Sequence, residues 1–410
     1  MTIDEAVPVY AGLDWAAEIH AVCVLDHDGR QLAAFTVEHS AEGIALLIRR
    51  LARHADPADV QVGIERPNGR LVDLLLEAGH PVVPVSPNAI KTWREGEVVS
   101  GPKSDAGDAA VIAEYLRLRN HKLRPVQPYS PQTKALRTVV RSRADLVQMR
   151  VAATNQLEAL LDAHWPGAKA IFADTESAIS LAFLRRYPTA ATAAHLGQKR
   201  LAAFTAREGY SGKRPASDLL ARLRHAPAGT TDPALTVAVG DAVLAFVEVV
   251  TALNNAIKQL DKSVATRLGE HPDAKIFTSL PRSGQINAAQ VLAEWGDVRE
   301  AYDRPDAVAA LAGVTPVTKE SGKRQHAVHF RWACNKRFRL ALTTFADNSR
   351  HSSPWAADIY DRARPQHRPP PRRPHPLARA WIRVIYRCWN DGTPYDPNLH
   401  GGARRLEIAA

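Results

Sequence analysis

Short apolar runs and amphipathic stretches alternate along residues 8–119. Short apolar runs bounded by turn residues predict strands, whereas apolar residues three and four positions apart predict helices. The pattern predicts three strands at 8–16, 19–29 and 30–39, with Asp-His-Asp-Gly as a hairpin turn. A helix, strand, helix, strand and helix are then predicted at 41–55, 59–66, 69–79, 80–87 and 104–119. This order predicts an α/β domain over residues 1–125.

Two long helices are predicted in the middle of the chain. Residues 134–165 carry a near-heptad apolar stripe, and a second stretch after Pro233 repeats apolar residues at intervals of three and four up to Val264. Such sustained spacing is typical of a coiled coil, either antiparallel within one chain or between chains. An ordinary helical hairpin that packs on its own core is the alternative. We expect a helical assembly domain at 126–268 with short helices between the long ones.

The last part of the chain, residues 269–410, is predicted to be a third, mostly helical domain. Near its start, at 277–297, a glycine-containing turn leads into a helix and can present backbone N–H groups to phosphate. The stretch at 362–376 is rich in proline and arginine, which predicts an irregular basic loop.

The composition narrows the class of partner. The formal net charge is +10, which indicates a polyanionic partner or a solvated basic surface. The three cysteines are far apart and odd in number, which favours a reduced, cytoplasmic compartment over a disulfide framework or a zinc site. We expect no membrane-spanning run, and the acidic start does not resemble a signal peptide.

Four acidic residues stand at informative positions. Asp14 and Glu65 lie at the ends of apolar runs, and Asp105 and Asp108 are three residues apart at the start of a helical pattern. A buried, unpaired glutamate is costly, so a cation near Glu65 is the natural reading. Magnesium prefers oxygen ligands and supports phosphoryl transfer. Asp105 and Asp108 could instead only interact with the helix dipole.

This order of strands and acids resembles that of nucleases and recombinases with a ribonuclease-H-like, Holliday-junction-resolvase-like fold. The fold places Asp14 centrally on the first strand and Glu65 at the end of the neighbouring strand. Together with the helical middle and residues 309–349, the acids resemble the DEDD-type transposases of the IS one-ten insertion-sequence family, which act as bridge-RNA-guided recombinases. The resemblance covers nearly the whole chain.

The resemblance implies further roles. The family's P-x-x-x-x-S-G motif reads Pro-Val-Thr-Lys-Glu-Ser-Gly here, so Ser321 is the implied nucleophile. In the basic helix that follows, Cys334 and Phe338 replace the usual Gly and Leu. A serine needs a base, a metal or a positive field to react, and nearby basic residues can supply that field or only contact backbone phosphates. The predicted nucleic-acid-binding residues are Lys134, Arg137, Arg141, Lys323, Arg324, Arg331, Asn335, Lys336 and Arg339.

The sequence therefore predicts a DNA transposase. Its four acids would bind Mg²⁺ or Mn²⁺, and Ser321 would form a covalent intermediate with DNA. Its expected partners are element and target DNA, a structured guide RNA and further copies of the chain. A metal-dependent junction resolvase that uses water as its nucleophile is one alternative, and a catalytically silent nucleic-acid-binding scaffold is another. Trp93 is read either as a core residue or as a platform for a nucleobase.

Overall fold

A computed structural model describes residues 7–97, 104–321, 324–329, 331–363 and 375–401 of the chain. Backbone contacts divide the protein into two compact units, Met1–Pro128 and Tyr129–Ala410. The first unit is a mixed α/β layer structure, and the second is almost entirely helical. The division into three domains at 125 and 268 stays a prediction.

The first unit is built on a five-stranded sheet with the order β3-β2-β1-β4-β5. Its strands are β1 (Val9–Asp14), β2 (Ile19–Leu25), β3 (Gln31–Glu38), β4 (Val60–Ile64) and β5 (Val82–Pro84). β1, β2 and β3 pair antiparallel as a meander, whereas β4 pairs parallel to β1 and β5 parallel to β4. The predicted three-strand meander and the following alternation are therefore present. β1 is buried from Val9 to Leu13 because it lies at the centre of the sheet.

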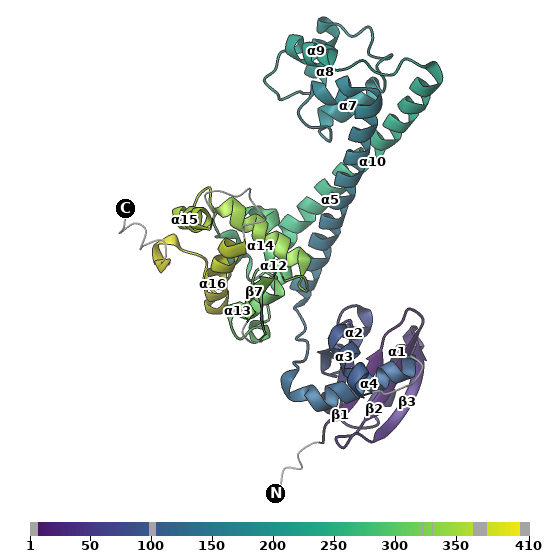
Figure 1. Ribbon diagram of the computed structural model, residues 1–410, viewed down its shortest axis with the longest axis vertical. Coiled ribbons are helices and arrows are strands. Elements are labelled where there is room, and N and C mark those ends of the chain that lie inside the picture. Colours follow the sequence, from purple (N-terminus) through teal and green to yellow (C-terminus); the bar gives the residue numbers. More distant parts are fainter. Residues whose placement is uncertain (1–6, 98–103, 322–323, 330, 364–374, 402–410) are drawn as a thin grey trace. The chain divides into compact units, whose positions relative to one another are not determined.

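Helices cover both faces of this sheet (Figure 1). Ala11 and Leu13 of β1 face one core with α1 (Ala41–Leu51) and α2 (Arg70–Glu77). Alternate residues of β1 and β2 face α4 (Asp105–Arg119) on the other side. This alternation follows from the period of two in a strand. The remaining elements are α3 (Pro87–Glu97), which the sequence did not predict, and the short helices η1 (Pro57–Asp59) and η2 (Asn120–Lys122).

Two glycines let α4 approach the sheet closely. A Cβ atom on Gly12 of β1 would lie 2.0 Å from the carbonyl oxygen of Ala109, and one on Gly63 of β4 would lie 3.0 Å from Ile112 Cγ2. Any larger side chain at position 12 would therefore push α4 away from β1. The two glycines are partners in the parallel register, so α4 crosses the middle of the sheet.

Two long helices, α5 (Pro131–His164) and α10 (Pro233–Gly269), form the frame of the second unit and lie side by side in Figure 1. They run antiparallel, because Arg143 binds Asp261 while Arg150, two turns later, donates to Asn254 at 3.0 Å. An antiparallel pair within one chain is thus present. Association of these helices between chains stays a prediction.

One end of this helix pair packs against four short helices. They are α6 (Pro166–Ile171), α7 (Ala178–Arg186), α8 (Gln198–Arg207) and α9 (Ala216–His225). Their core contains Leu157 and Leu161 of α5, Val243 and Val247 of α10, and an aromatic group around Phe183. Short helices between the long ones were predicted from the sequence, and they are present.

The segment that follows α10 packs against the other end of the pair. Its helices are α11 (Ala274–Thr278), α12 (Gly284–Trp295), α13 (Pro305–Leu311), α14 (Lys336–Ser349), α15 (Pro354–Arg362) and α16 (His375–Asp391), with η3 (Arg299–Ala301) and η4 (Pro397–Leu399). β6 (Val317–Ser321) and β7 (Arg324–His329) form an antiparallel hairpin that the sequence did not predict. Leu136 and Val264 of the long helices join the core around Trp295, Trp381 and Trp389.

The expectation about apolar runs was wrong for α10. This helix is long and apolar enough to cross a membrane, by length and composition alone. Core helices, which are mostly buried, pass the same test. In α10, 28% of the apolar window is buried, and the buried residues of the helix include Val239, Val243, Val247 and Val250. The finding is therefore weak support for a membrane span.

Candidate active site

Two of the predicted acids lie at the carboxyl ends of neighbouring strands, at one edge of the sheet. Asp14 is the last residue of β1, rather than central in it, and Glu65 directly follows β4. Leu13 and Ile64, the residues just before them, are partners in the parallel register. The two carboxylates therefore extend from neighbouring strands at the same end, and both residues are half-buried.

The other two acids are brought to this edge by the direction of α4. Ala109, near the start of α4, packs with Ala21 of β2. Ala21 is the antiparallel partner of Asp14. Leu116 near its end packs with Tyr10 at the opposite end of β1. α4 thus runs antiparallel to β1, so Asp105 and Asp108 in its first turn lie towards the Asp14 end. Ser104 caps the helix by accepting a hydrogen bond from the Gly107 backbone N–H.

The side chains at this edge differ in environment. Asp105 is exposed, whereas Asp108 keeps only 16% of its side chain exposed and forms an ion pair with Arg94 of α3. An all-oxygen donor set fits a hard divalent cation such as Mg²⁺. In the part of the chain that the structure describes, however, no three His, Cys, Asp or Glu side chains are grouped closely enough to hold an ion. The fold brings the four acids to one edge without closing them around one point.

Ser321 belongs to the second unit and ends β6. In the hairpin register its partner is Arg324, the first residue of β7. Val317 and His329 pair at one end of the hairpin, and Ser321 and Arg324 pair at the other end. Lys323 and the side chains of Ser321 and Arg324 lie outside the described residues, as does most of the Pro- and Arg-rich stretch.

Two arginines after the hairpin donate hydrogen bonds to backbone carbonyl oxygens next to its two strands. Arg331 Nε donates to the carbonyl oxygen of Thr315 at 3.3 Å, and Arg339 donates to the carbonyl oxygens of Ala312 and Arg331. Asn335 is the N-cap of α14, where its side chain accepts from the backbone N–H of Phe338. Lys336 is exposed at the start of α14. Of these residues, Lys336 has the side chain most open to a nucleic acid.

Comparison with known proteins identifies the family. Residues 11–166, which contain all four acids, match a DEDD-type family described as "Transposase", and residues 274–361, which contain Ser321, match the family "Transposase IS116/IS110/IS902 family". The chain is 32% identical over 370 residues to the "Mini-circle putative transposase for IS117" of Streptomyces coelicolor, covering 88% of this chain and 89% of that protein. The chain belongs to the IS110 family of transposases.

Two further relatives extend the match along almost the whole transposase. The "Insertion element IS900 uncharacterized 42 kDa protein" of Mycobacterium paratuberculosis is 27% identical, covering 96% of this chain and 98% of that protein. The "Insertion element IS116 uncharacterized 44.8 kDa protein" of Streptomyces clavuligerus is 26% identical, covering 95% and 96%. The resemblance inferred from the sequence motifs is confirmed at the level of the family.

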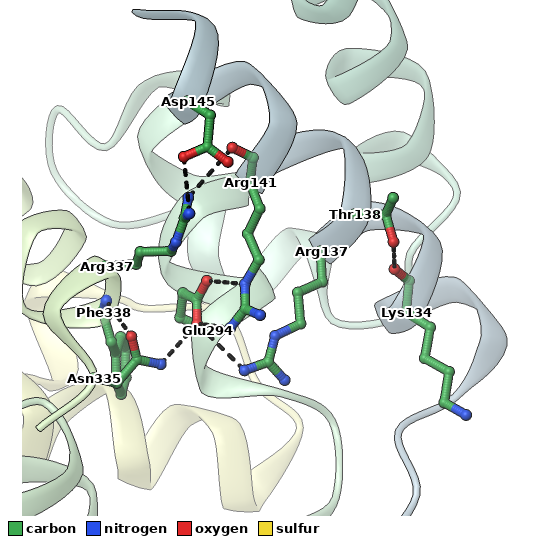
Figure 2. A network of polar contacts seen from close by, with 9 residues as sticks. All are labelled: Lys134, Arg137, Thr138, Arg141, Asp145, Glu294, Asn335, Arg337 and Phe338. Atoms are coloured by element: carbon green, nitrogen blue, oxygen red, sulfur yellow. Dashed lines mark hydrogen bonds and ion pairs between the residues drawn. The ribbon is translucent and has the colours of Figure 1, made fainter. Parts of the chain in front are cut away.

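A polar centre that sequence reasoning missed lies on Glu294 of α12. Arg137 and Arg141 of α5, both predicted to bind nucleic acid, donate to this carboxylate, together with Asn335 (Figure 2). Burial tends to raise the pKa of Glu294, but hydrogen bonds from Arg141 and Asn335 and the arginine charges bring this pKa below its usual value. A glutamate between Ala293 and Trp295 in an apolar helix was the signal available in the sequence.

Other basic residues of α5 have local partners too. Arg143 pairs with Asp261, and Arg150 with Glu176 at 3.0 Å. Lys134 is half-buried near the start of α5. Trp93 packs edge-to-face on Tyr115 with centroids 5.7 Å apart, and it lines a pocket of about 320 Å³ with Arg119 and Lys122. Nucleic-acid contacts of Lys134, Arg137 and Arg141, and stacking of Trp93 on a nucleobase, stay predictions.

Proposed function

We propose that this transposase cleaves and rejoins DNA with the four acids as a divalent-cation site and Ser321 as nucleophile. Support for the acid site is that β1, β4 and the start of α4 meet at one edge of the sheet, which is the arrangement expected of a ribonuclease-H-like nuclease fold. Asp14, Glu65, Asp105 and Asp108 would hold Mg²⁺ or Mn²⁺. Such a cation offsets charge on phosphate oxygens.

The covalent step exchanges one phosphate ester bond for another, so the bond energy is retained for rejoining. Ser321 Oγ loses its proton and bonds to the scissile phosphorus, while the bond from phosphorus to the leaving nucleotide oxygen breaks and that oxygen gains a proton. A hydroxyl of another DNA end then attacks the phosphoserine diester and restores the serine. Lys323, Arg324 and Arg331 are close to Ser321 in sequence and would stabilise the developing negative charge.

The experiment that tests this proposal follows labelled element DNA on denaturing gels. Wild-type protein should form a protein–DNA adduct that survives denaturation and disappears on protease treatment. Ser321→Ala should form no adduct and should not cleave. If Ser321→Ala still cleaves in a metal-dependent way, water is the nucleophile and the protein is a nuclease of the resolvase type. If neither protein alters DNA, the silent scaffold is the correct reading.

Guidance by RNA and assembly are further parts of the proposal. A structured RNA from the element would select sites by base pairing, while the protein holds backbone and shape. Exposed apolar side chains on the long helices, namely Met149, Val151, Val237 and Val249, are consistent with contact between copies of the chain. We also propose that Ser321 of one protomer acts with the acids of another. A mixture of Asp14→Ala and Ser321→Ala proteins should then form the adduct only on the Asp14→Ala chain.

That mixture has two controls. Each variant alone should form no adduct, and subunit exchange should be shown separately with two affinity tags. An exchanged mixture without any adduct would mean that the acids and the serine act within one chain.

A further inference from the structure

Glu294 is a buried charge with a large set of donors. Only 2% of its side chain is exposed, on the apolar helix α12. Burying a carboxylate without partners costs several kcal/mol, so such a group is found where its hydrogen bonds are complete. Here Oε1 accepts from Arg141 Nε at 2.8 Å, and Oε2 accepts from Arg141 Nη2 at 2.8 Å, Arg137 Nη2 at 3.3 Å and Asn335 Nδ2 at 2.7 Å.

These donors come from two separate parts of the fold (Figure 2). Arg137 and Arg141 are one turn apart on α5, whereas Asn335 stands at the start of α14. Glu294 on α12 therefore joins three helices. A second contact reinforces the same junction, since Arg337 donates to the carbonyl oxygen of Arg141 at 3.3 Å and to Asp145 at 2.8 Å. The start of α14 is fixed to the long helix at both places.

From Asn335 the bonds continue to the base of the β6–β7 hairpin. The Asn335 backbone N–H donates to the carbonyl oxygen of Leu311 at 2.8 Å. Arg339, one turn later on α14, donates to the carbonyl oxygens of Ala312 and Arg331. Arg331 in turn donates to that of Thr315, two residues before β6 begins. The segments that enter and leave the hairpin are thus both attached to α14, which Glu294 holds.

The orientation of the Asn335 amide depends on this carboxylate. Its Nδ2 donates to Glu294, which leaves Oδ1 to accept from the Phe338 N–H and cap α14. A neutral glutamine in place of Glu294 has a single acceptor oxygen, so it cannot satisfy all the donors around it. It also leaves two arginines without a buried counter-charge. The network needs the charge as well as the shape of the side chain.

We propose that Glu294 is a positioning residue for the recombination chemistry, which sets the β6–β7 hairpin, and Ser321 at its end, through Asn335 and α14. This inference rests on the proposed role of Ser321. A purely structural role would lower stability without a specific effect on the hairpin. Small displacements of a reacting group can cost orders of magnitude in rate, so the chemical step is the sensitive readout.

The test uses the full-length protein and the covalent adduct assay at saturating DNA. Glu294→Gln should slow adduct formation by about tenfold or more, with the DNA dissociation constant changed less than about twofold. The matched control is Asp273→Asn. This side chain is also largely buried, at 11% exposed, and accepts two hydrogen bonds from Arg299 in the same unit, at 2.6 and 2.7 Å. The control should lower the melting temperature but leave the rate of adduct formation unchanged.

A second substitution tests the hydrogen bond itself. Asn335→Asp alone puts two carboxylates within hydrogen-bond distance and should impair the protein. Combined with Glu294→Gln, it restores one donor facing one acceptor and returns the negative charge, while aspartate still caps α14. The double variant should therefore react faster than Glu294→Gln, whereas independent effects would make it slower. If Glu294→Gln does not fold, Asn335→Ser keeps a capping hydroxyl, removes the donor to Glu294, and should slow the reaction in the same way.

Amide hydrogen exchange in the hairpin separates this inference from the proposed function. In Glu294→Gln, residues 317–329 should exchange faster than in wild type, and in Asp273→Asn they should not. Unchanged exchange, a rate equal to wild type, or an equal loss of rate in the Asp273→Asn control would each overturn the positioning role. If wild-type protein forms no adduct at all, the role of Ser321 is wrong, and the exchange experiment still decides whether Glu294 holds the hairpin.

Discussion

The acid edge of the first unit and the Glu294 network of the second use the same chemical group in opposite environments. Asp14, Glu65 and Asp105 are half-buried or exposed at the ends of regular elements. Glu294 is fully enclosed, and guanidinium and amide donors reach both of its oxygens. Carboxylates that keep access to solvent can exchange ligands during a reaction. A carboxylate saturated by protein donors instead fixes the elements around it.

Arg94 and Arg141 sharpen this contrast. Arg94 pairs with Asp108 at the acid edge, where 28% of the arginine side chain stays exposed. Arg141 donates twice to Glu294, and this hydrogen bonding raises the pKa of the guanidinium further above its usual value. Under the proposed function, Arg94 would compete with a cation for Asp108, whereas Arg141 completes the hydrogen bonding of Glu294. The two regions should therefore respond differently to the same substitution.

The largest expected effect is on catalysis at the acid edge. Glu65→Gln keeps the shape of the side chain but removes its charge, so DNA cleavage should fall by roughly a thousandfold, or about 4 kcal/mol of activation free energy. Unfolding should be almost unchanged. Cleavage assays with Mg²⁺, with Mn²⁺ and with EDTA measure the effect. Full cleavage by wild-type protein in EDTA would remove the metal-site proposal.

The free energy of unfolding should fall more on substitution of Glu294 than on substitution of an acid-edge residue. Glu294→Ala leaves two arginines around a buried gap and should destabilise the second unit by about 3 kcal/mol. This is the low end for a buried pair, because 36% of the Arg141 side chain is exposed and water can reach it. Asp14→Ala should cost less than about 1 kcal/mol, because the residue is half-buried at a strand end. Calorimetry of both variants makes the comparison, and equal losses would contradict it.

Acid should act on the network through the lowered pKa of Glu294. A carboxyl whose folded pKa lies below its unfolded value stabilises the protein above that unfolded value, here near 4.5, and this stability is lost as the pH falls through the folded pKa. Wild type should therefore lose stability below about pH 4.5 more steeply than Glu294→Gln. Denaturant unfolding between pH 3 and pH 7 measures the two slopes. Parallel curves would mean that the pKa of Glu294 is the same in the folded and unfolded protein.

The smallest expected effect concerns the salt dependence of DNA binding. Lys134→Gln and Lys336→Ala should each flatten the slope of log affinity against log salt by about one unit, if each lysine contacts a phosphate. Arg137→Gln should change that slope less, because its guanidinium already donates to Glu294. Binding titrations at several salt concentrations provide the slopes. A larger change for Arg137→Gln than for the lysines would assign the arginine to the DNA interface.

Much of the first unit was accessible from sequence because its signals are local. Apolar runs over Val9–Asp14, Ile19–Leu25 and Val60–Ile64 predicted strands that are present in the structure. Ser104 marked the start of α4, and it is the cap. The second unit was harder. Val317–Ser321 and Arg324–His329 form paired strands that their polar, basic composition did not indicate, because backbone pairing rather than an apolar pattern defines them.

The sequence by itself determined most of the element order in the first unit, the family and the four candidate acids, since periodicity, caps and motif spacing are properties of neighbouring residues. Only the tertiary structure decided which charges meet. Arg141 and Glu294 are 153 residues apart, and Asn335 lies 41 residues beyond Glu294. Helical periodicity shows that Arg137 and Arg141 share a face, but not whether that face meets solvent, DNA or a buried carboxylate. That choice depends on how α5, α12 and α14 pack, because a buried charge is tolerated only where all of its partners are brought together.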